Sequence, residues 1–133
     1  MRGEPVVVDT SCWVEYFNRP EEEAANAVRV LIQADRAVLN GVILAELLQG
    51  ARTAGEASEL RYALGAVAWA ETSREVYGRA GDLGFDLRRR GVTVPVTDCV
   101  IAASAETIGG RILTLDGHFE EIARYTCLTL LPV

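Results

Sequence analysis

Residues 5–13 read PVVVDTSCW, and this stretch decides the fold that we predict. The consecutive valines predict a strand buried on both faces, because a strand with one solvated face alternates apolar and polar residues. The strand ends on a carboxylate, Asp9, and two hydroxyl residues, Thr10 and Ser11, follow it. Ser11 is expected to cap a short helix over residues 11–17. A charge at the end of a core strand suggests that Asp9 serves a site.

The rest of the chain alternates short apolar strands with helical segments. We expect further strands over 37–40, 111–115 and 127–131. We expect helices over 20–32, 41–52, 55–64, 73–90, 97–108 and 117–124. Pro20 would occupy the first position of the helix over 20–32, Thr72 or Ser73 would cap the helix over 73–90, and Thr97 or Asp98 would cap the helix over 97–108. This alternation predicts an α/β fold in which helices cover both faces of a parallel sheet, in one domain over residues 1–133.

The charged residues exclude several classes of enzyme. The 133 residues include 19 acids and 13 bases, for a net charge of −6, and every base is arginine. A P-loop needs a lysine on its phosphates, and phosphoacceptor domains of the response-regulator and haloacid-dehalogenase kinds also use a lysine. His118 is the single histidine, which excludes chemistry that needs two. Carboxylates must therefore carry any catalysis.

The sequence also indicates no membrane-spanning segment, no disulfide and no zinc site. No apolar run approaches the ~18 residues that a membrane helix requires, and the N-terminus shows no signal-peptide core. Cys12, Cys99 and Cys127 are odd in number and far apart, so we expect each to be a free core residue. The sequence thus predicts a soluble cytoplasmic protein.

Four carboxylates stand in positions that favour a shared site. Asp9 and Asp116 each follow a predicted strand, and ligands of open α/β sheets bind outside the carboxyl ends of strands. Glu46 is the one charge in VILAELL, a helix apolar enough to be mostly buried. Asp98 opens DCVIAASAE, where the small residues allow close approach of a ligand.

Each acid taken alone also has a structural explanation. Asp9 and Asp116 could accept hydrogen bonds in strand-to-helix turns, Asp98 could cap a helix, and Glu46 could lie on a helix surface. Taken together, clustered carboxylates repel one another unless a cation joins them. Because no lysine is present and the donors are oxygens, Mg²⁺ or Mn²⁺ is the cation that we predict.

Four segments of the chain resemble the PIN-domain nucleases in motif, order and spacing, across essentially its whole length. They are PVVVDTS at 5–11, GVILAELLQGA at 41–51, TDCVIAASA at 97–105 and ILTLDGHF at 112–119. The second and fourth look most like those of VapC-type toxins of bacterial toxin–antitoxin pairs. The resemblance implies a three-layer α/β/α domain with a central parallel sheet, and a metal-dependent endoribonuclease that cleaves RNA phosphodiester bonds.

The resemblance also implies roles for individual residues. Asp9, Glu46, Asp98 and Asp116 would form the catalytic acidic cluster. Asp9, Asp98 and Asp116 would hold the metal, and Glu46 would be a further ligand or orient the attacking water. Thr10 and Thr114 match hydroxyl positions that line such sites. Many relatives carry an aspartate where this chain has His118, which could bind metal, position a phosphate, or simply begin a helix.

Partners follow from the same resemblance. It implies an RNA substrate, a cognate antitoxin that inhibits the enzyme, and a homodimer. The alternatives are a housekeeping PIN nuclease for RNA processing and a PIN-like binding module that has lost its activity. Because the net charge is negative, we expect a local basic rim for RNA from Arg52, Arg88, Arg89 and Arg90, although solvated helix ends are another explanation for these arginines.

Overall fold

The computed structural model describes residues 3–133, in which parallel strands form one sheet in the order β3-β2-β1-β4. The strands are β1 (Val6–Val8), β2 (Ala37–Leu39), β3 (Ala68–Trp69) and β4 (Arg111–Leu113). All of the paired strands in this sheet are parallel, so the predicted parallel α/β architecture is confirmed.

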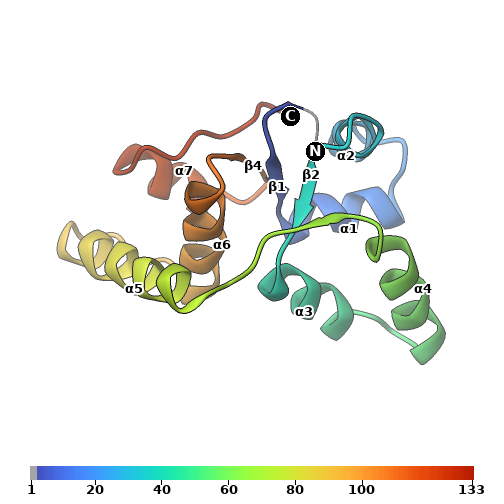
Figure 1. Ribbon diagram of the computed structural model, residues 1–133, viewed down its shortest axis with the longest axis horizontal. Helices are drawn as coiled ribbons and strands as arrows, with labels where there is room; N and C mark the ends of the chain where they lie inside the picture. Colours follow the sequence, from blue (N-terminus) through green and yellow to red (C-terminus); the bar gives the residue numbers. More distant parts are fainter. Residues whose placement is uncertain (1–2) are drawn as a thin grey trace.

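Helices cover both faces of this sheet. They are α1 (Thr10–Asn18), α2 (Glu23–Gln33), α3 (Gly41–Gln49), α4 (Ala54–Leu64), α5 (Arg74–Arg89), α6 (Val96–Thr107) and α7 (His118–Arg124). Figure 1 shows α5, α6 and α7 on one side of β1 and β2, and α1, α2 and α4 on the other. The predicted three-layer α/β/α arrangement is therefore confirmed.

The pairing of β1 with β4 positions the first predicted acid. Val8 of β1 is in register with Leu113 of β4, and the N–H of Asp9 donates to the carbonyl of Leu113 at 2.9 Å. One residue further along, Asp9 and Thr114 are therefore neighbours at the carboxyl edge of the sheet. Gly110 makes this approach of the strands possible, because a Cβ there would lie 2.7 Å from the carbonyl oxygen of Pro5.

Helix α6 carries the second predicted acid to the same edge. Its residues from Asp98 to Ala105 are all buried, and the helix packs against β1, β4 and α5. Because α6 is enclosed on so many sides, small and apolar side chains occupy nearly every position. The N-terminal turn of α6, which contains Asp98, lies where the helix meets the carboxyl ends of the strands.

Several predicted helix starts are wrong by a few residues. Ser11 lies inside α1, whose N-cap is Asp9, and Pro20 precedes α2 by three residues. Thr97 and Asp98 lie in the first turn of α6 and do not cap it. The predicted cap at Ser73 is confirmed, because its hydroxyl accepts the N–H of Val76.

Other differences concern strands and burial. The predicted strand over 127–131 is reduced to one parallel bridge between Leu130 and Ile112, and the two-residue strand β3 was not predicted. Cys127 is exposed, whereas Cys12 and Cys99 are buried as predicted. The helix containing Glu46 is less buried than expected, since Ile43 and Leu47 are its buried residues. Within residues 3–133, no helix has the length and apolar content to cross a membrane.

Candidate functional site

Two carboxylates and the histidine lie together at the carboxyl edge of the sheet. Asp98 belongs to the first turn of α6, Asp116 follows β4, and His118 begins α7. Nδ1 of His118 lies 2.8 Å from Oδ2 of Asp98 and 3.3 Å from Oδ1 of Asp116. One ligand atom from each of the three residues lies within 4.8 Å of the others. Two segments distant in sequence therefore converge on one small volume.

A short turn fixes the positions of Asp116 and His118. The backbone N–H of His118 donates to Oδ1 of Asp116 at 2.9 Å, and the N–H of Asp116 donates to Oγ1 of Thr114 at 2.9 Å. These bonds hold the segment between β4 and α7 with both Asp116 and His118 facing Asp98. The Asp116 and His118 side chains remain 39% and 47% exposed, which leaves them accessible to a ligand.

Asp9 occupies a neighbouring, more enclosed position. The hydroxyls of Ser11 and Thr114 each donate to its Oδ2 at 2.8 Å, and the residue is 5% exposed. In the described part of the chain, no donor bonds to Oδ1 of Asp9. Asp9 is not a member of the group formed by Asp98, Asp116 and His118, but Thr114 bonds both to Asp9 and to the backbone of Asp116.

Glu46 is hydrogen-bonded to Thr10, the residue that follows Asp9. Oγ1 of Thr10 donates to Oε1 of Glu46 at 2.7 Å, across a sequence separation of 36 residues. This contact joins the first turn of α1 to α3. The structure thus accounts for both predicted hydroxyls, since Thr10 orients Glu46 and Thr114 orients Asp9.

The pKa of Asp98 reflects its burial more than the neighbouring carboxylates. Burial raises the pKa of the Asp98 carboxyl above its ordinary value, and the nearby carboxylates of Asp116 and Asp9 raise it further. The hydrogen bond from His118 opposes this shift. A divalent cation would relieve the repulsion among the carboxylates, so the donor set suits one.

The residues present are chemically suited to a hard or borderline divalent ion. Two carboxylates and one imidazole form the compact group, Thr114 links Asp9 to it, and Glu46 is bonded to Thr10, the residue after Asp9. Carboxylate oxygens suit Mg²⁺ and Mn²⁺, and an imidazole nitrogen suits transition metals better than Mg²⁺.

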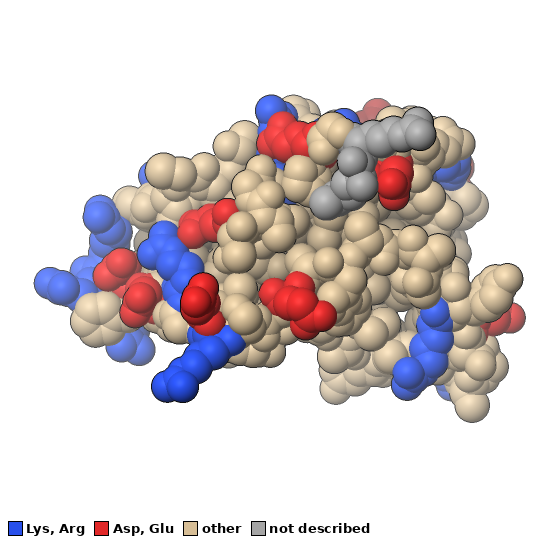
Figure 2. Space-filling model, in the orientation of Figure 1, with Lys and Arg blue, Asp and Glu red and all other residues tan. Residues whose placement is uncertain are grey.

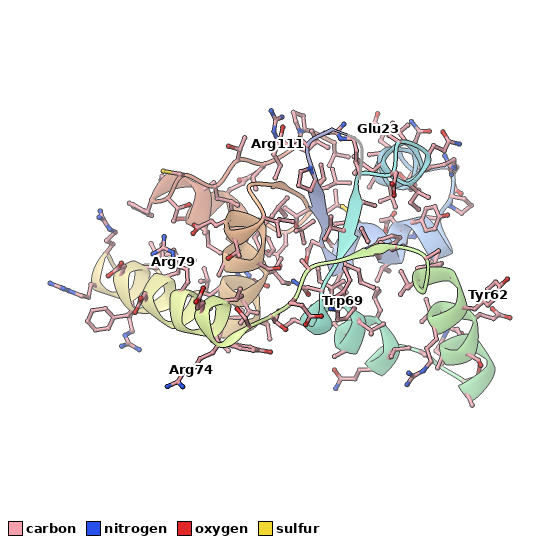
Figure 3. The ribbon with its side chains drawn as sticks, viewed as in Figure 1. Glu23, Tyr62, Trp69, Arg74, Arg79 and Arg111 are labelled. Atoms are coloured by element: carbon pink, nitrogen blue, oxygen red, sulfur yellow. The ribbon has the colours of Figure 1, made fainter. Side chains whose placement is uncertain are left out.

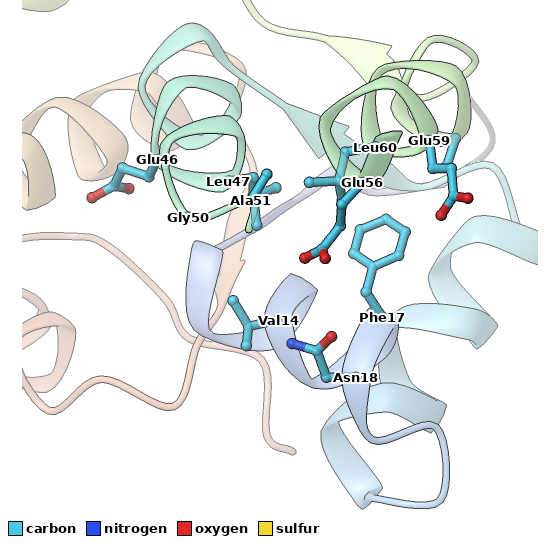
Figure 4. A pocket seen from close by; sticks show the side chains of 11 residues that line it. Val14, Phe17, Asn18, Glu46, Leu47, Gly50, Ala51, Glu56, Glu59 and Leu60 are labelled. Carbon is cyan, nitrogen blue, oxygen red and sulfur yellow. The ribbon is translucent and has the colours of Figure 1, made fainter. Parts of the chain in front are cut away.

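A groove opens beside Glu46, between α1, α3 and α4. It has a volume of about 550 Å³, and its lining includes Phe17, Leu47, Glu56 and Leu60. Figure 4 shows the Glu56 carboxylate directed toward Phe17 and Asn18, with Glu46 at the opposite end of the groove from Glu59. The groove therefore combines an apolar floor with carboxylates, and it reaches the candidate site at Glu46.

Ser11 is the site residue that the sequence reasoning placed wrongly. Besides donating to Asp9, its Oγ accepts the backbone N–H of Leu115 at 3.0 Å and lies 3.5 Å from Oγ1 of Thr114. The signal was present in the sequence, as a second hydroxyl two residues after the strand-end acid. A serine that follows a strand-end aspartate reads equally well as a helix cap, and only the pairing of β1 with β4 distinguishes the two.

We expect replacement of Ser11 by alanine to loosen Asp9 without unfolding the protein. The variant loses one hydrogen bond to a carboxylate and leaves the Leu115 N–H without its acceptor, so stability should fall by ~1 kcal/mol. Any metal-dependent activity should fall by roughly 10-fold, as is usual when a residue that orients a ligand is removed. The matched control is Ser58→Ala on exposed α4. Equal activity of the two variants would contradict the role of Ser11.

Most of the chain is similar to known proteins of one kind. The profile of the PIN domain matches residues 6–125. Ribonuclease VapC11 of Mycobacterium tuberculosis and a VapC ribonuclease of Mycobacterium bovis are each 34% identical over 127 residues, covering 92% of this chain and 95% of the relative.

Solved structures are similar in fold at lower sequence identity. VapBC2 from Rickettsia felis, bound to a DNA fragment from its promoter, matches with a TM-score of 0.79 and 21% identity, over 95% of this chain and 96% of that one. VapBC-5 from Mycobacterium tuberculosis matches with a TM-score of 0.72 and 20% identity, over 98% and 99% of the two chains.

Proposed function

The chain belongs to the PIN domain family, and on this premise we propose that it is an endoribonuclease that uses a divalent cation to cleave RNA phosphodiester bonds. One observation carries the proposal: Asp98, Asp116 and His118 offer ligand atoms within 4.8 Å of one another at the carboxyl edge of the sheet. The 34% identity to VapC ribonucleases supports RNA as the substrate.

We propose Mg²⁺ or Mn²⁺ as the cofactor. Asp98 and Asp116 would hold the ion, with His118 as a nitrogen ligand and Oδ1 of Asp9 as a further oxygen ligand. When bound, such an ion would offset the negative charge of the phosphate and lower the pKa of a coordinated water. Asp98 and His118 lie in α6 and α7, and Asp9 and Asp116 lie in the turns that follow β1 and β4, which suits a reaction that depends on exact positioning.

The surrounding residues would keep these ligands in position. Ser11 and Thr114 hold Oδ2 of Asp9, so its Oδ1 would serve as the ligand atom. Thr10 holds Oε1 of Glu46, so Oε2 can orient the attacking water and accept its proton. Arginine is the only strong cation of this chain, so arginines would bind the RNA phosphates.

We further propose that the protein is the toxin of a toxin–antitoxin pair that acts in the cytoplasm as a single PIN domain over residues 1–133. A cognate antitoxin would occupy the groove beside Glu46 and place an arginine among the site carboxylates. The groove's apolar lining residues Phe17 and Leu60 and the acids Glu56 and Glu59 suit a basic amphipathic segment. A homodimer remains a prediction that rests on the family resemblance alone.

Expression of the chain in bacteria without its partner is the test of this function. We expect slowed growth and new, discrete RNA ends, because uninhibited endonuclease activity cuts cellular RNA. Co-expression of the small protein encoded beside it should suppress both effects and yield a stable complex. The control is the Asp98→Asn variant, which should produce no new ends.

Two outcomes separate this function from its alternatives. RNA cleavage that no neighbouring gene product inhibits would favour a housekeeping PIN nuclease. The absence of metal-dependent cleavage of any RNA would favour an inactive binding module, and would contradict the proposed enzyme.

A further inference from the structure

Arginines gather at the C-terminal end of α5, away from the acidic site. The cluster consists of Arg88 and Arg89 in the last turn of α5 and of Arg90, its C-cap. Figure 2 shows basic side chains concentrated over this end of the helix in an otherwise mixed surface. Because the whole chain has a net charge of −6, a run of three adjacent cations needs an explanation beyond composition.

These arginines differ from several others in the described part of the chain. Four arginines elsewhere pair with acids, in the pairs Arg52–Glu56, Arg79–Glu106, Arg111–Glu4 and Arg124–Glu121. Figure 3 shows one of these paired arginines, Arg79, near the middle of α5. Within residues 3–133, neither Arg88, Arg89 nor Arg90 forms an ion pair or a side-chain hydrogen bond. Their positive charge is therefore available to an external anion.

The guanidinium groups of Arg89 and Arg90 each lie over an aromatic ring. The guanidinium carbon of Arg89 lies 5.6 Å from the centroid of Phe85, and that of Arg90 lies 5.1 Å from the centroid of Tyr125. The rings themselves are 50% and 39% exposed. A guanidinium over a ring can still direct its N–H groups outward, so its charge stays accessible, and the part of the ring that it does not cover remains exposed.

This surface is hollowed, and it extends toward α6 and α7, the helices that carry Asp98 and His118. A hollow of about 380 Å³ is lined by Asp86, Arg89 and Arg90. A second groove of about 420 Å³ has Phe85 and Arg88 in its lining, together with Cys99, the residue after Asp98. On the other side, Tyr125 directly follows α7, whose seven residues place it about 10 Å along the helix from His118.

From this arrangement we propose that Phe85, Arg88, Arg89, Arg90 and Tyr125 form an RNA-contact surface that binds the single-stranded substrate on one side of the scissile phosphate, an inference that rests on the proposed function. Unpaired arginines bind backbone phosphates, and exposed aromatic rings stack with bases without regard to sequence. A purely structural role for helix-end arginines explains neither the two exposed rings nor the hollow.

Binding of RNA at different salt concentrations tests this surface. All proteins carry Asp98→Asn so that the RNA stays intact, and the probe is a fluorescein-labelled single-stranded RNA of about 12 nucleotides. The triple variant Arg88→Gln, Arg89→Gln, Arg90→Gln should lower the slope of log affinity against log salt by about 2, since each phosphate contact on a single strand contributes ~0.7.

The matched control removes the same charge elsewhere. Arg19→Gln, Arg61→Gln and Arg74→Gln replace three exposed arginines that form no ion pair within residues 3–133, and Figure 3 shows Arg74 at the opposite end of α5. This control should keep the parent slope. Phe85→Leu and Tyr125→Leu should each weaken binding by roughly 10-fold while leaving the slope unchanged, because they remove stacking and not charge.

Three results would contradict an RNA-contact role for this surface. The first is an unchanged salt slope in the Arg88–Arg90 variant, and the second is an equal decrease of the slope in the control. The third is a variant that binds RNA normally but no longer binds a partner protein, which would identify the surface as a protein interface. In each case RNA still binds, so the proposed nuclease stands. The proposed function is contradicted as well if the Asp98→Asn parent binds no RNA and the unmodified protein cuts no RNA in Mg²⁺ or Mn²⁺.

Discussion

The Asp98→Asn variant is expected to lose RNA cleavage by ~10³-fold while its metal-free form unfolds at the same temperature as the unmodified protein or higher. A catalytic metal supplies several kcal/mol of transition-state stabilisation, and ~4 kcal/mol corresponds to that factor in rate. Asparagine keeps the shape of the side chain and can still accept the hydrogen bond from Nδ1 of His118. It removes one of the charges that repel one another in the absence of a cation.

The pH dependence of stability follows from the same group. The pKa of Asp98 is raised in the folded state, chiefly by burial and further by Asp116 and Asp9, so the folded protein binds this proton more tightly than the unfolded chain does. The metal-free protein should therefore lose stability as the pH rises from about 3.8, the ordinary value, through the raised pKa of Asp98. The Asp98→Asn variant should lack this loss.

Thermal unfolding across this pH range measures both effects. Asp82→Asn, on the exposed surface of α5, is the matched control and should alter neither cleavage nor the pH dependence. An Asp98→Asn variant that unfolds well below the parent in the absence of metal would instead identify Asp98 as a structural residue of the α6 turn.

Removal of metal is expected to abolish cleavage entirely. With EDTA present the activity should vanish, and added Mg²⁺ or Mn²⁺ should restore it. Ca²⁺ should restore it poorly, because its looser coordination orients a water less sharply. Because His118 contributes a nitrogen to the ligand group, Mn²⁺ should reach half of its maximal activation at a lower concentration than Mg²⁺.

The His118→Asp variant tests whether the imidazole nitrogen causes the expected preference for Mn²⁺ over Mg²⁺. It replaces the imidazole nitrogen by carboxylate oxygens and should bring the half-activating concentrations of the two ions closer together. Cleavage titrations with each ion measure this shift. Full activity of the unmodified protein in EDTA would rule out the metal mechanism, whatever the behaviour of His118.

The fold was predictable because its strongest signals are local. A run of three valines can be buried on both faces only in a central strand, and β1 is that strand. Two-residue β3 gave no comparable signal, because Ala68 and Trp69 pair only at the sheet edge, next to β2. The C-terminal run CLTLL reads as a strand, but only Leu130 bridges to β4.

The candidate site was predictable in its residue types but not in its grouping. Strand-end position indicated Asp9 and Asp116, and an apolar context indicated Glu46 and Asp98. Which of them lie closest together depends on the register of β1 against β4 and on the docking of α6, and neither is encoded in local spacing. For this reason the sequence could not show that His118 lies between Asp98 and Asp116, or that Thr10 holds Glu46.

The most direct test of the proposed metal site is thermal unfolding with and without Mg²⁺ or Mn²⁺, with RNA cleavage measured on the same preparations. The unmodified protein should gain stability from the metal and cut RNA. The Asp9→Asn and Asp98→Asn variants should be at least as stable without metal, gain less from it because the gain follows metal affinity, and lose cleavage. Variants that unfold markedly earlier without metal, yet still cut RNA, would show that these acids are turn residues and not the ligands of a catalytic metal.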